Sequence, residues 1–261
     1  MAKGLEAMDA STKTQVRHCE THGEYEAIGY ELGSRVTWLA CPECTRESHA
    51  KNVADLANKE ALERQRLIEQ RLSQAGIPLR FRNKDFASFR TDTDEMERAR
   101  SVAMEFARNF DAHAKAGTAL VFLGKIGTGK SHLALAIASA IMPTYTAMYT
   151  SAIDAVRMVR DTWRRNSDKS ESQVLRALAS VDLLILDEIG VQYGTESEQV
   201  TLFDIIDKRY RDQRPVILLT NLTASEMKTF LGDRSYDRLR EGGKFVVFNW
   251  ESQRGKAANG A

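Results

Sequence analysis

The octapeptide GKIGTGKS at residues 124–131 decides the fold of this chain, together with the apolar run ALVFL before it and the helix-favouring stretch HLALAIASAIM after it. Its spacing fits the phosphate-binding loop G-x-x-x-x-G-K-[ST], which joins a strand to a helix. The glycines let the backbone turn its N–H groups toward phosphate oxygens, and the helix start adds the positive end of a dipole. The pattern therefore predicts a site for a nucleoside triphosphate.

Each residue type in this loop has an expected role. Lys130 is expected to neutralise the β- and γ-phosphates, and the hydroxyl of Ser131 is expected to bind Mg²⁺. The expected phosphate-contacting set is Gly124, Lys125, Ile126, Gly127, Thr128, Gly129, Lys130, Ser131 and His132. No Asn-Lys-x-Asp guanine signature follows the loop, so the predicted cofactors are ATP and Mg²⁺.

Two acids end the apolar run LLIL at residues 183–186. Ligands of open α/β sheets bind beyond the carboxyl ends of the strands, beside a loop of this kind. Asp187 is therefore expected to bind Mg²⁺, and Glu188 to orient and deprotonate an attacking water. A glutamate in this position favours ATP hydrolysis over phosphate transfer to a small molecule.

Apolar runs alternate with helical stretches from residue 77 onward. The expected strands are residues 119–123, 145–150, 181–186, 216–220 and 245–248, and the expected helices are residues 132–142, 153–165 and 198–211. Continuous apolar strands separated by helices predict a parallel sheet covered on both faces, which is the α/β class.

With these motifs, residues from about 77 to 254 resemble the AAA+ ATPases of the DnaC type, the helicase loaders. The likeness rests on the phosphate loop, on LLILDEIG at residues 183–190, on LLTNLT at 218–223 and on LGDRSYDRLREGGKFVVFNWES at 231–252. It implies an AAA+ three-layer sandwich with a five-stranded parallel sheet. It also implies that the usual helical lid is absent, since only about twenty residues follow Arg240. The implied function is ATP-dependent loading of a replicative DNA helicase onto single-stranded DNA.

The resemblance assigns roles to residues whose local pattern leaves other interpretations open. Asn221 would sense the γ-phosphate, although such a residue also suits a turn. Arg238 would be the arginine finger that enters a neighbouring subunit's ATP site, with Arg234 as second candidate; both also suit surface ion pairs. Residues 151–169 would contact single-stranded DNA. The expected DNA contacts are Arg157, Arg160, Trp163, Arg164 and Arg165. The alternative is an amphipathic helix with a solvated basic face and a packed Trp163.

The three cysteines lie in the first fifth of the chain. Cys19-x-x-His22 and Cys41-x-x-Cys44 form two close pairs, which is typical of a closed tetrahedral zinc site. Such a site is structural, because it leaves no open position for a substrate. The alternative is three incidental cysteines, and His18 and His49 are spare imidazoles.

The expected domains are a zinc-ribbon-like module at residues 1–49, a helical linker at 50–76 and the ATPase domain at 77–261. Apolar residues recur at helical spacing in the linker, namely Val53, Leu56, Ala57, Ala61, Leu67, Ile68 and Leu72. This stripe fits either a surface helix with one buried face or a helix that binds a partner. The resemblance implies that residues 1–76 recognise the helicase.

Composition bounds the remaining possibilities. The 43% apolar and 28% charged residues are ordinary for a globular protein, and the net charge of +1 leaves nucleic-acid binding to a local patch. No run is long enough to cross a bilayer and no secretory signal begins the chain, so we expect a cytoplasmic protein without membrane contact. Two other functions remain open: a transposition helper of the related IstB type, and an adaptor switched by nucleotide with little hydrolysis.

Overall fold

The computed structural model describes residues 12–32, 35–190 and 195–255, apart from some side chains between residues 61 and 80. The chain forms two compact units, residues 1–65 and 66–261, and the boundary falls within one long helix. The first 11 residues of the expected zinc module and the last six of the expected ATPase domain lie outside the described residues.

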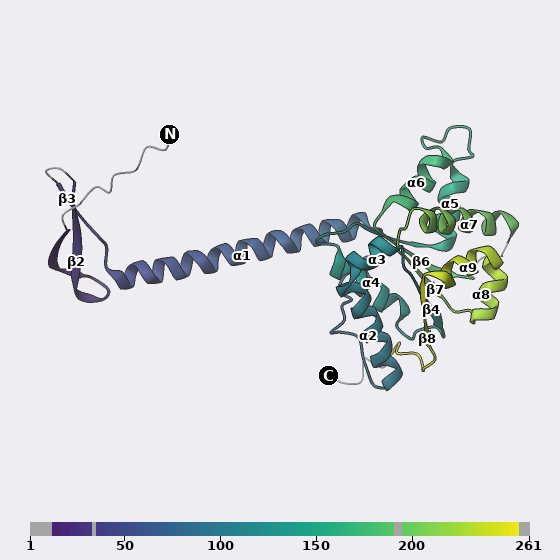
Figure 1. Cartoon of the computed structure of the whole chain (residues 1–261), viewed down its shortest axis with the longest axis horizontal. Coiled ribbons are helices and arrows are strands. Elements are labelled where there is room, and N and C mark those ends of the chain that lie inside the picture. Colours follow the sequence, from purple (N-terminus) through teal and green to yellow (C-terminus); the bar gives the residue numbers. More distant parts are fainter. Residues whose placement is uncertain (1–11, 33–34, 191–194, 256–261) are drawn as a thin grey trace, which may run out of the picture. The chain divides into compact units, whose positions relative to one another are not determined.

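The first unit is built on three antiparallel strands, β1 (Thr12–Cys19), β2 (Gly23–Leu32) and β3 (Arg35–Trp38), in the order β1-β2-β3 (Figure 1). A tight turn joins β1 to β2, where Cys19 pairs with Gly23. Ala27 and Cys41 are buried. Most other side chains of these strands are at least partly exposed, so this small sheet has little apolar core of its own.

Helix α1 (Pro42–Gln74) begins eight residues before the expected start of the linker at residue 50, and Cys44 therefore lies in its first turn. Proline is well suited to the first position of a helix, because a backbone N–H at that position would have no partner within the helix. The expected stop is confirmed, since Gly76 follows with a φ of 72°. Val53 and Leu56 are 55% and 58% exposed, so this part of the apolar stripe is not buried. The side chains of Ala61, Leu67, Ile68 and Leu72 lie outside the described residues.

The second unit contains the expected parallel sheet of five strands, in the order β5-β6-β7-β4-β8. The strands are β4 (Ala119–Gly124), β5 (Ala147–Ser151), β6 (Leu183–Ile189), β7 (Val216–Thr220) and β8 (Gly243–Phe248). Successive side chains of β4 enter opposite cores: Leu120 and Phe122 face one, whereas Val121 and Leu123 face the other.

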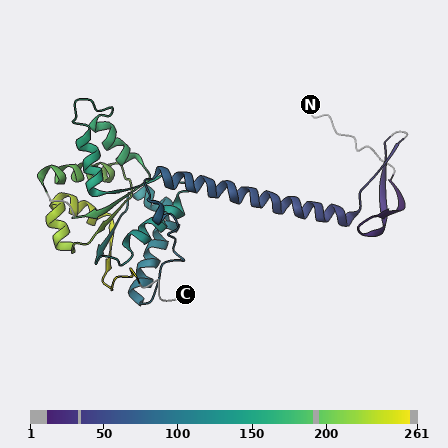
Figure 2. The same cartoon turned by 180° about the vertical axis from the view of Figure 1, so that it is seen from behind.

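Helices cover both faces of this sheet, as Figures 1 and 2 show from opposite sides. The first face carries α2 (Asp94–Arg108), α3 (Phe110–Ala116) and α4 (Lys130–Ile141). The second carries α5 (Ala152–Asp161), α6 (Glu171–Ser180), α7 (Glu196–Arg211), α8 (Ala224–Leu231) and α9 (Asp233–Glu241). The short 3₁₀ helix η1 (Leu79–Phe81) follows the linker. The expected three-layer α/β fold is therefore confirmed.

The helix expected at residues 153–165 is shorter than predicted. Helix α5 ends at Asp161 rather than at residue 165, because turns take over from Thr162. After β8 the described tail, residues 249–255, holds no helix. No described helix is both long and apolar enough to span a membrane.

A fully buried arginine on α7 links the end of α6 to the segment before the interior strand β7. The guanidinium of Arg209 donates to backbone carbonyls at the end of α6 and before β7, including Leu178 O at 2.9 Å and Ala179 O at 3.0 Å. Burial lowers its pKa to about 9. One side chain thus satisfies helix-end carbonyls that would otherwise lack a donor.

Candidate nucleotide and metal sites

The predicted phosphate loop joins β4 to α4 at the carboxyl end of the sheet. Gly129 has a φ of 96°, and a Cβ added there would lie 2.6 Å from the ring of Phe89. Only glycine fits such a position, because other residues strain at positive φ. The loop therefore has the strand–loop–helix context that phosphate binding requires.

The amine of Lys130 folds back into this loop. Lys130 Nζ donates to Gly124 O and Lys125 O, both at 2.7 Å, and to Asn221 Oδ1 at 2.9 Å. Burial lowers the pKa of Lys130 to about 8. Asn221 follows β7, so the amine and the amide meet where the phosphates of a nucleotide would lie.

Asp187, at the end of β6, lies beside the start of α4 as expected. Its Oδ2 accepts from the Ser131 hydroxyl at 2.8 Å and from the Tyr149 hydroxyl at 2.7 Å, while its Oδ1 accepts from Glu188 N at 2.7 Å. A hydroxyl and a carboxylate in contact at the start of the loop helix are ligands that suit Mg²⁺. Tyr149 was missing from the sequence-based site, because only the pairing of β5 with β6 places it there.

Glu188 differs from Asp187 in its surroundings. It is exposed and has a φ of 59°, and the pairing of β6 with β7 shifts register between Leu186 and Ile189. Such bulges redirect side chains beside functional sites, and a positive φ on a non-glycine residue has an energetic cost. The backbone thus turns Glu188 out of the sheet while Asp187 stays buried.

The segment that follows β8 donates hydrogen bonds to backbone carbonyls of the phosphate loop. Trp250 Nε1 donates to Thr128 O at 2.9 Å, and the backbone N–H of Gln253 donates to Gly127 O at 2.8 Å. Trp250, in the stretch 231–252 on which the resemblance rests, therefore has a structural role here. On the other side, Phe89 packs edge-on against His132, whose Nε2 lies 2.8 Å from Asp85 O. Contact of His132 with phosphate stays a prediction.

The two finger candidates on α9 have different environments. Arg238 forms an ion pair with Asp207, and its guanidinium lies over the rings of Phe203 and Tyr210, at 5.0 and 5.5 Å. Its side chain is 27% exposed. Arg234 is exposed. A trans role for either arginine stays a prediction.

The expected DNA-contacting residues lie on α5 and in the turns after it, mostly in ion pairs. Arg157 pairs with Asp154 at 3.2 Å, Arg160 with Glu198 at 3.6 Å, and Arg164 with Asp161 at 3.0 Å. Arg165 is exposed. Trp163 is not packed in the core: it is 60% exposed, and its Nε1 donates to Glu171 at 2.7 Å. Contact with single-stranded DNA stays a prediction.

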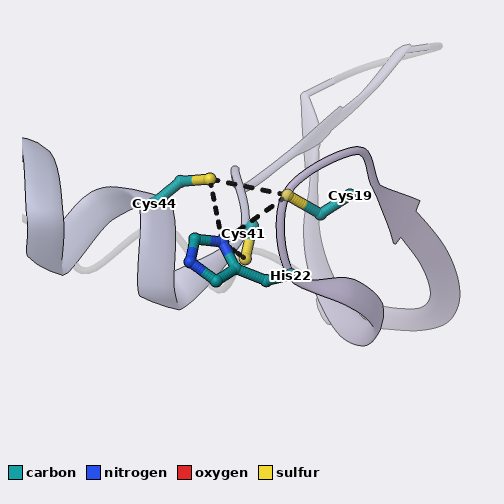
Figure 3. A group of neighbouring side chains, drawn as sticks. All are labelled: Cys19, His22, Cys41 and Cys44. Carbon is teal, nitrogen blue, oxygen red and sulfur yellow. Dashed lines mark hydrogen bonds between the residues drawn. The ribbon is translucent and has the colours of Figure 1, made fainter.

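The four expected zinc ligands meet in the N-terminal unit (Figure 3). Their ligand atoms all lie within 4.8 Å of one another. The Cys19 and Cys44 sulfurs are 3.5 Å apart, and His22 Nδ1 lies 3.3 Å from Cys44 Sγ and 3.8 Å from Cys41 Sγ. A tetrahedron around zinc has edges of roughly 3.5–3.8 Å for these ligand types. The cluster therefore fits a closed zinc site.

Electrostatics around this cluster also favour a cation. Backbone hydrogen bonds from His22 and Thr21 lower the pKa of Cys19 to about 6, and the adjacent Cys19 raises the pKa of Cys44 to about 11. Crowded thiols oppose one another's ionisation until a metal neutralises them. His22 Nε2 lies 3.1 Å from Glu47, a carboxylate that would orient the imidazole.

Comparisons with known proteins relate this chain to ATP-binding proteins and helicase loaders. Residues 40–261 match the family described as IstB-like ATP binding protein. The chain is 36% identical to the replicative helicase loader DnaC of Escherichia coli strain K12 over 191 residues, which is 72% of this chain and 76% of that protein. It is 32% identical to the loader of the same name from Buchnera aphidicola subsp. Baizongia pistaciae, over 78% of this chain and 80% of that one. A crystal structure of the DnaC helicase loader superposes with a TM-score of 0.60 and 20% identity, covering 66% of this chain and 99% of the other.

Proposed function

Since this chain belongs to the IstB-like ATP-binding protein family, we propose that it loads a replicative DNA helicase onto single-stranded DNA in an ATP-dependent reaction. The observation that carries the proposal is the 36% identity to the helicase loader DnaC, which extends over 72% of this chain. The contacts among Lys130, Ser131, Asp187 and Asn221 support a nucleotide site of the expected kind.

In this proposal the protein hydrolyses ATP to ADP and phosphate. Lys130 exchanges its carbonyl and amide partners for phosphate oxygens, and the loop N–H groups hold the same anion. Ser131 and Asp187 hold Mg²⁺, which when bound would neutralise charge on the β- and γ-phosphates. Glu188, turned into solvent at the bulge, orients and deprotonates the attacking water. Asn221, which accepts a hydrogen bond from Lys130, senses the γ-phosphate.

Hydrolysis in this proposal depends on self-association, because an arginine from a neighbouring subunit completes the site. Arg238 reaches a neighbour only after its ion pair with Asp207 breaks. Arg234 is already exposed and needs no such rearrangement. Comparing turnover of Arg234→Ala and Arg238→Ala, alone and mixed with a Glu188→Gln subunit, identifies the finger.

Single-stranded DNA binds, in this proposal, along α5 and the turns after it. The exposed ring of Trp163 supports base stacking, and the exposed Arg165 supports a phosphate contact. The ion pairs of Arg157, Arg160 and Arg164 with acids oppose tight binding at those three positions.

Residues 1–76 recognise the helicase and bind structural zinc through Cys19, His22, Cys41 and Cys44. Exposed apolar side chains of the small sheet, such as Val16 at 66%, and of α1, such as Leu56 at 58%, support a protein-binding role. A pull-down with residues 77–261 tests this assignment. Helicase binding equal to that of the whole chain contradicts it.

The direct test of function is loading of a hexameric replicative helicase onto circular single-stranded DNA covered by single-strand-binding protein. We expect unwinding of an annealed strand to require this protein and ATP, and to fail with Lys130→Ala. A preference for duplex over single-stranded DNA favours the IstB-type transposition helper instead. Full loading by Glu188→Gln without turnover favours the nucleotide-switched adaptor.

A further inference from the structure

Tyr149 is the third residue of the edge strand β5, and its hydroxyl contacts the candidate magnesium carboxylate. The Tyr149 hydroxyl donates to Asp187 Oδ2 at 2.7 Å. The side chain is partly buried and packs against the apolar core on the α4 face of the sheet. An aromatic ring held in this way can place its hydroxyl with little rotational freedom.

Within the described part of the chain, three groups donate hydrogen bonds to the carboxylate of Asp187. Ser131 and Tyr149 donate to Oδ2, and the backbone N–H of Glu188 donates to Oδ1. Of these donors, Ser131 is the one whose oxygen is itself a magnesium ligand in the proposed site. Tyr149 and the Glu188 N–H then remain as the groups that orient Asp187, one on each carboxylate oxygen.

The backbone of Tyr149 is fixed from both sides. It is paired with Ile185 of β6, and its N–H donates to Ala75 O at 2.8 Å. Ala75 and Ile77 are each 3% exposed, so the segment that follows α1 is itself buried. The edge strand is thus covered at the point where the tyrosine reaches the site.

We propose that Tyr149 is the positioning residue of the magnesium site: its hydroxyl holds the Asp187 carboxylate in the orientation that binds the metal with ATP. The proposal rests on the ATP and Mg²⁺ site of the proposed function. Groups that hydrogen-bond a metal ligand typically contribute 10–100-fold in metal affinity or activity. Tyr149 therefore affects magnesium-dependent binding more than nucleotide binding itself.

The test is the variant Tyr149→Phe in the full chain, which keeps the ring and removes the hydroxyl. The measurement is the affinity for a fluorescent ATP analogue, once with saturating Mg²⁺ and once in EDTA. The affinity with Mg²⁺ divided by the affinity in EDTA gives the contribution of magnesium to binding. This ratio can be measured without hydrolysis. General loosening of the fold changes both affinities alike and leaves the ratio unchanged.

A matched control is Tyr145→Phe, because Tyr145 lies just before the same strand and its hydroxyl bonds Asp111 on α3, away from the site. We expect the ratio to fall about tenfold in Tyr149→Phe and to stay within about twofold of the unmodified protein in Tyr145→Phe. Affinity in EDTA stays within about twofold for both variants.

Two results overturn the proposal, and they are distinguishable. A ratio for Tyr149→Phe within twofold of the unmodified protein removes the positioning role and leaves the nucleotide site intact. An unmodified protein whose affinity is the same with Mg²⁺ and EDTA removes the magnesium site, and the role of Tyr149 with it.

Discussion

Replacing Glu188 by glutamine separates nucleotide binding from hydrolysis in this protein. The side chain is exposed, and glutamine has nearly the same shape, so we expect the free energy of unfolding to change by less than about 0.5 kcal/mol. The backbone φ of 59° has a similar cost for both residues, because each carries a Cβ. The bond from the Glu188 N–H to Asp187 Oδ1 does not involve the side chain and remains.

In Glu188→Gln we therefore expect a loss of rate in the hydrolysis step alone. A positioned general base contributes roughly 10²–10⁴-fold to a rate, which corresponds to about 3–5 kcal/mol of barrier. We expect phosphate release by Glu188→Gln to fall by at least about a hundredfold, with affinity for Mg–ATP unchanged within about threefold. Phosphate release in the presence of helicase and DNA measures the first quantity, and calorimetry the second.

The control is Glu95→Gln, the same change at an exposed position on α2, outside the segment proposed to bind the helicase. It should leave both quantities unchanged. Turnover of Glu188→Gln within threefold of the unmodified protein would refute the general-base role. Loss of ATP binding would instead show that the side chain holds the nucleotide site together.

Three other outcomes follow from the same contacts. Burial lowers the pKa of Lys130 to about 8, and phosphate needs the protonated amine; ATP affinity should therefore fall as pH rises from 7.5 to 9, and a flat titration opposes the predicted contact. Arg209→Leu should lower the free energy of unfolding by about 3–5 kcal/mol in denaturant titrations, because it strands buried carbonyls; a loss below about 1 kcal/mol contradicts this account. Zinc must displace protons from His22, whose hydrogen bonds to Cys19 and Glu47 raise its pKa to about 9, and from Cys44, whose pKa is about 11. Zinc affinity should hence rise by at least about a hundredfold per pH unit near neutrality, as chelator competition would measure, and pH-independent affinity counts against this ligand set.

The central strands β4 and β7 were predictable because each is buried on both faces and is therefore almost entirely apolar. The run at residues 216–220 coincides with β7, whereas the run at 181–186 stops short of the end of β6. That strand continues through two acids, because hydrogen bonds satisfy the buried carboxylate of Asp187 and Glu188 lies at a bulge. The spacing of apolar residues indicates neither these hydrogen bonds nor the bulge.

Several helices were not expected, although their starts carry local signals. Helices α6 and α8 begin with capping boxes, Ser170 with Gln173 and Thr223 with Glu226. Each helix is short, and its few apolar positions do not form a long periodic pattern. At the N-terminal end, α1 begins directly at Pro42, a residue that suits a helix start as well as a turn.

The candidate sites divide in the same way. Lys130, Ser131 and Asp187 belong to motifs with fixed local spacing, so the sequence alone places them together. Tyr149 and Trp250 reach the phosphate loop only through strand pairing and the path of the chain after β8. The ion pair of Arg238 with Asp207 joins two helices whose packing no local pattern encodes.

Calorimetry of the intact chain with ATP, in the presence of Mg²⁺, tests whether the loop at residues 124–131 binds the nucleotide. We expect saturable heat for the unmodified protein and none for Lys130→Ala, because that amine is the proposed cation beside the polyphosphate. Equal heats for the two proteins, or no heat for either, would contradict this expectation.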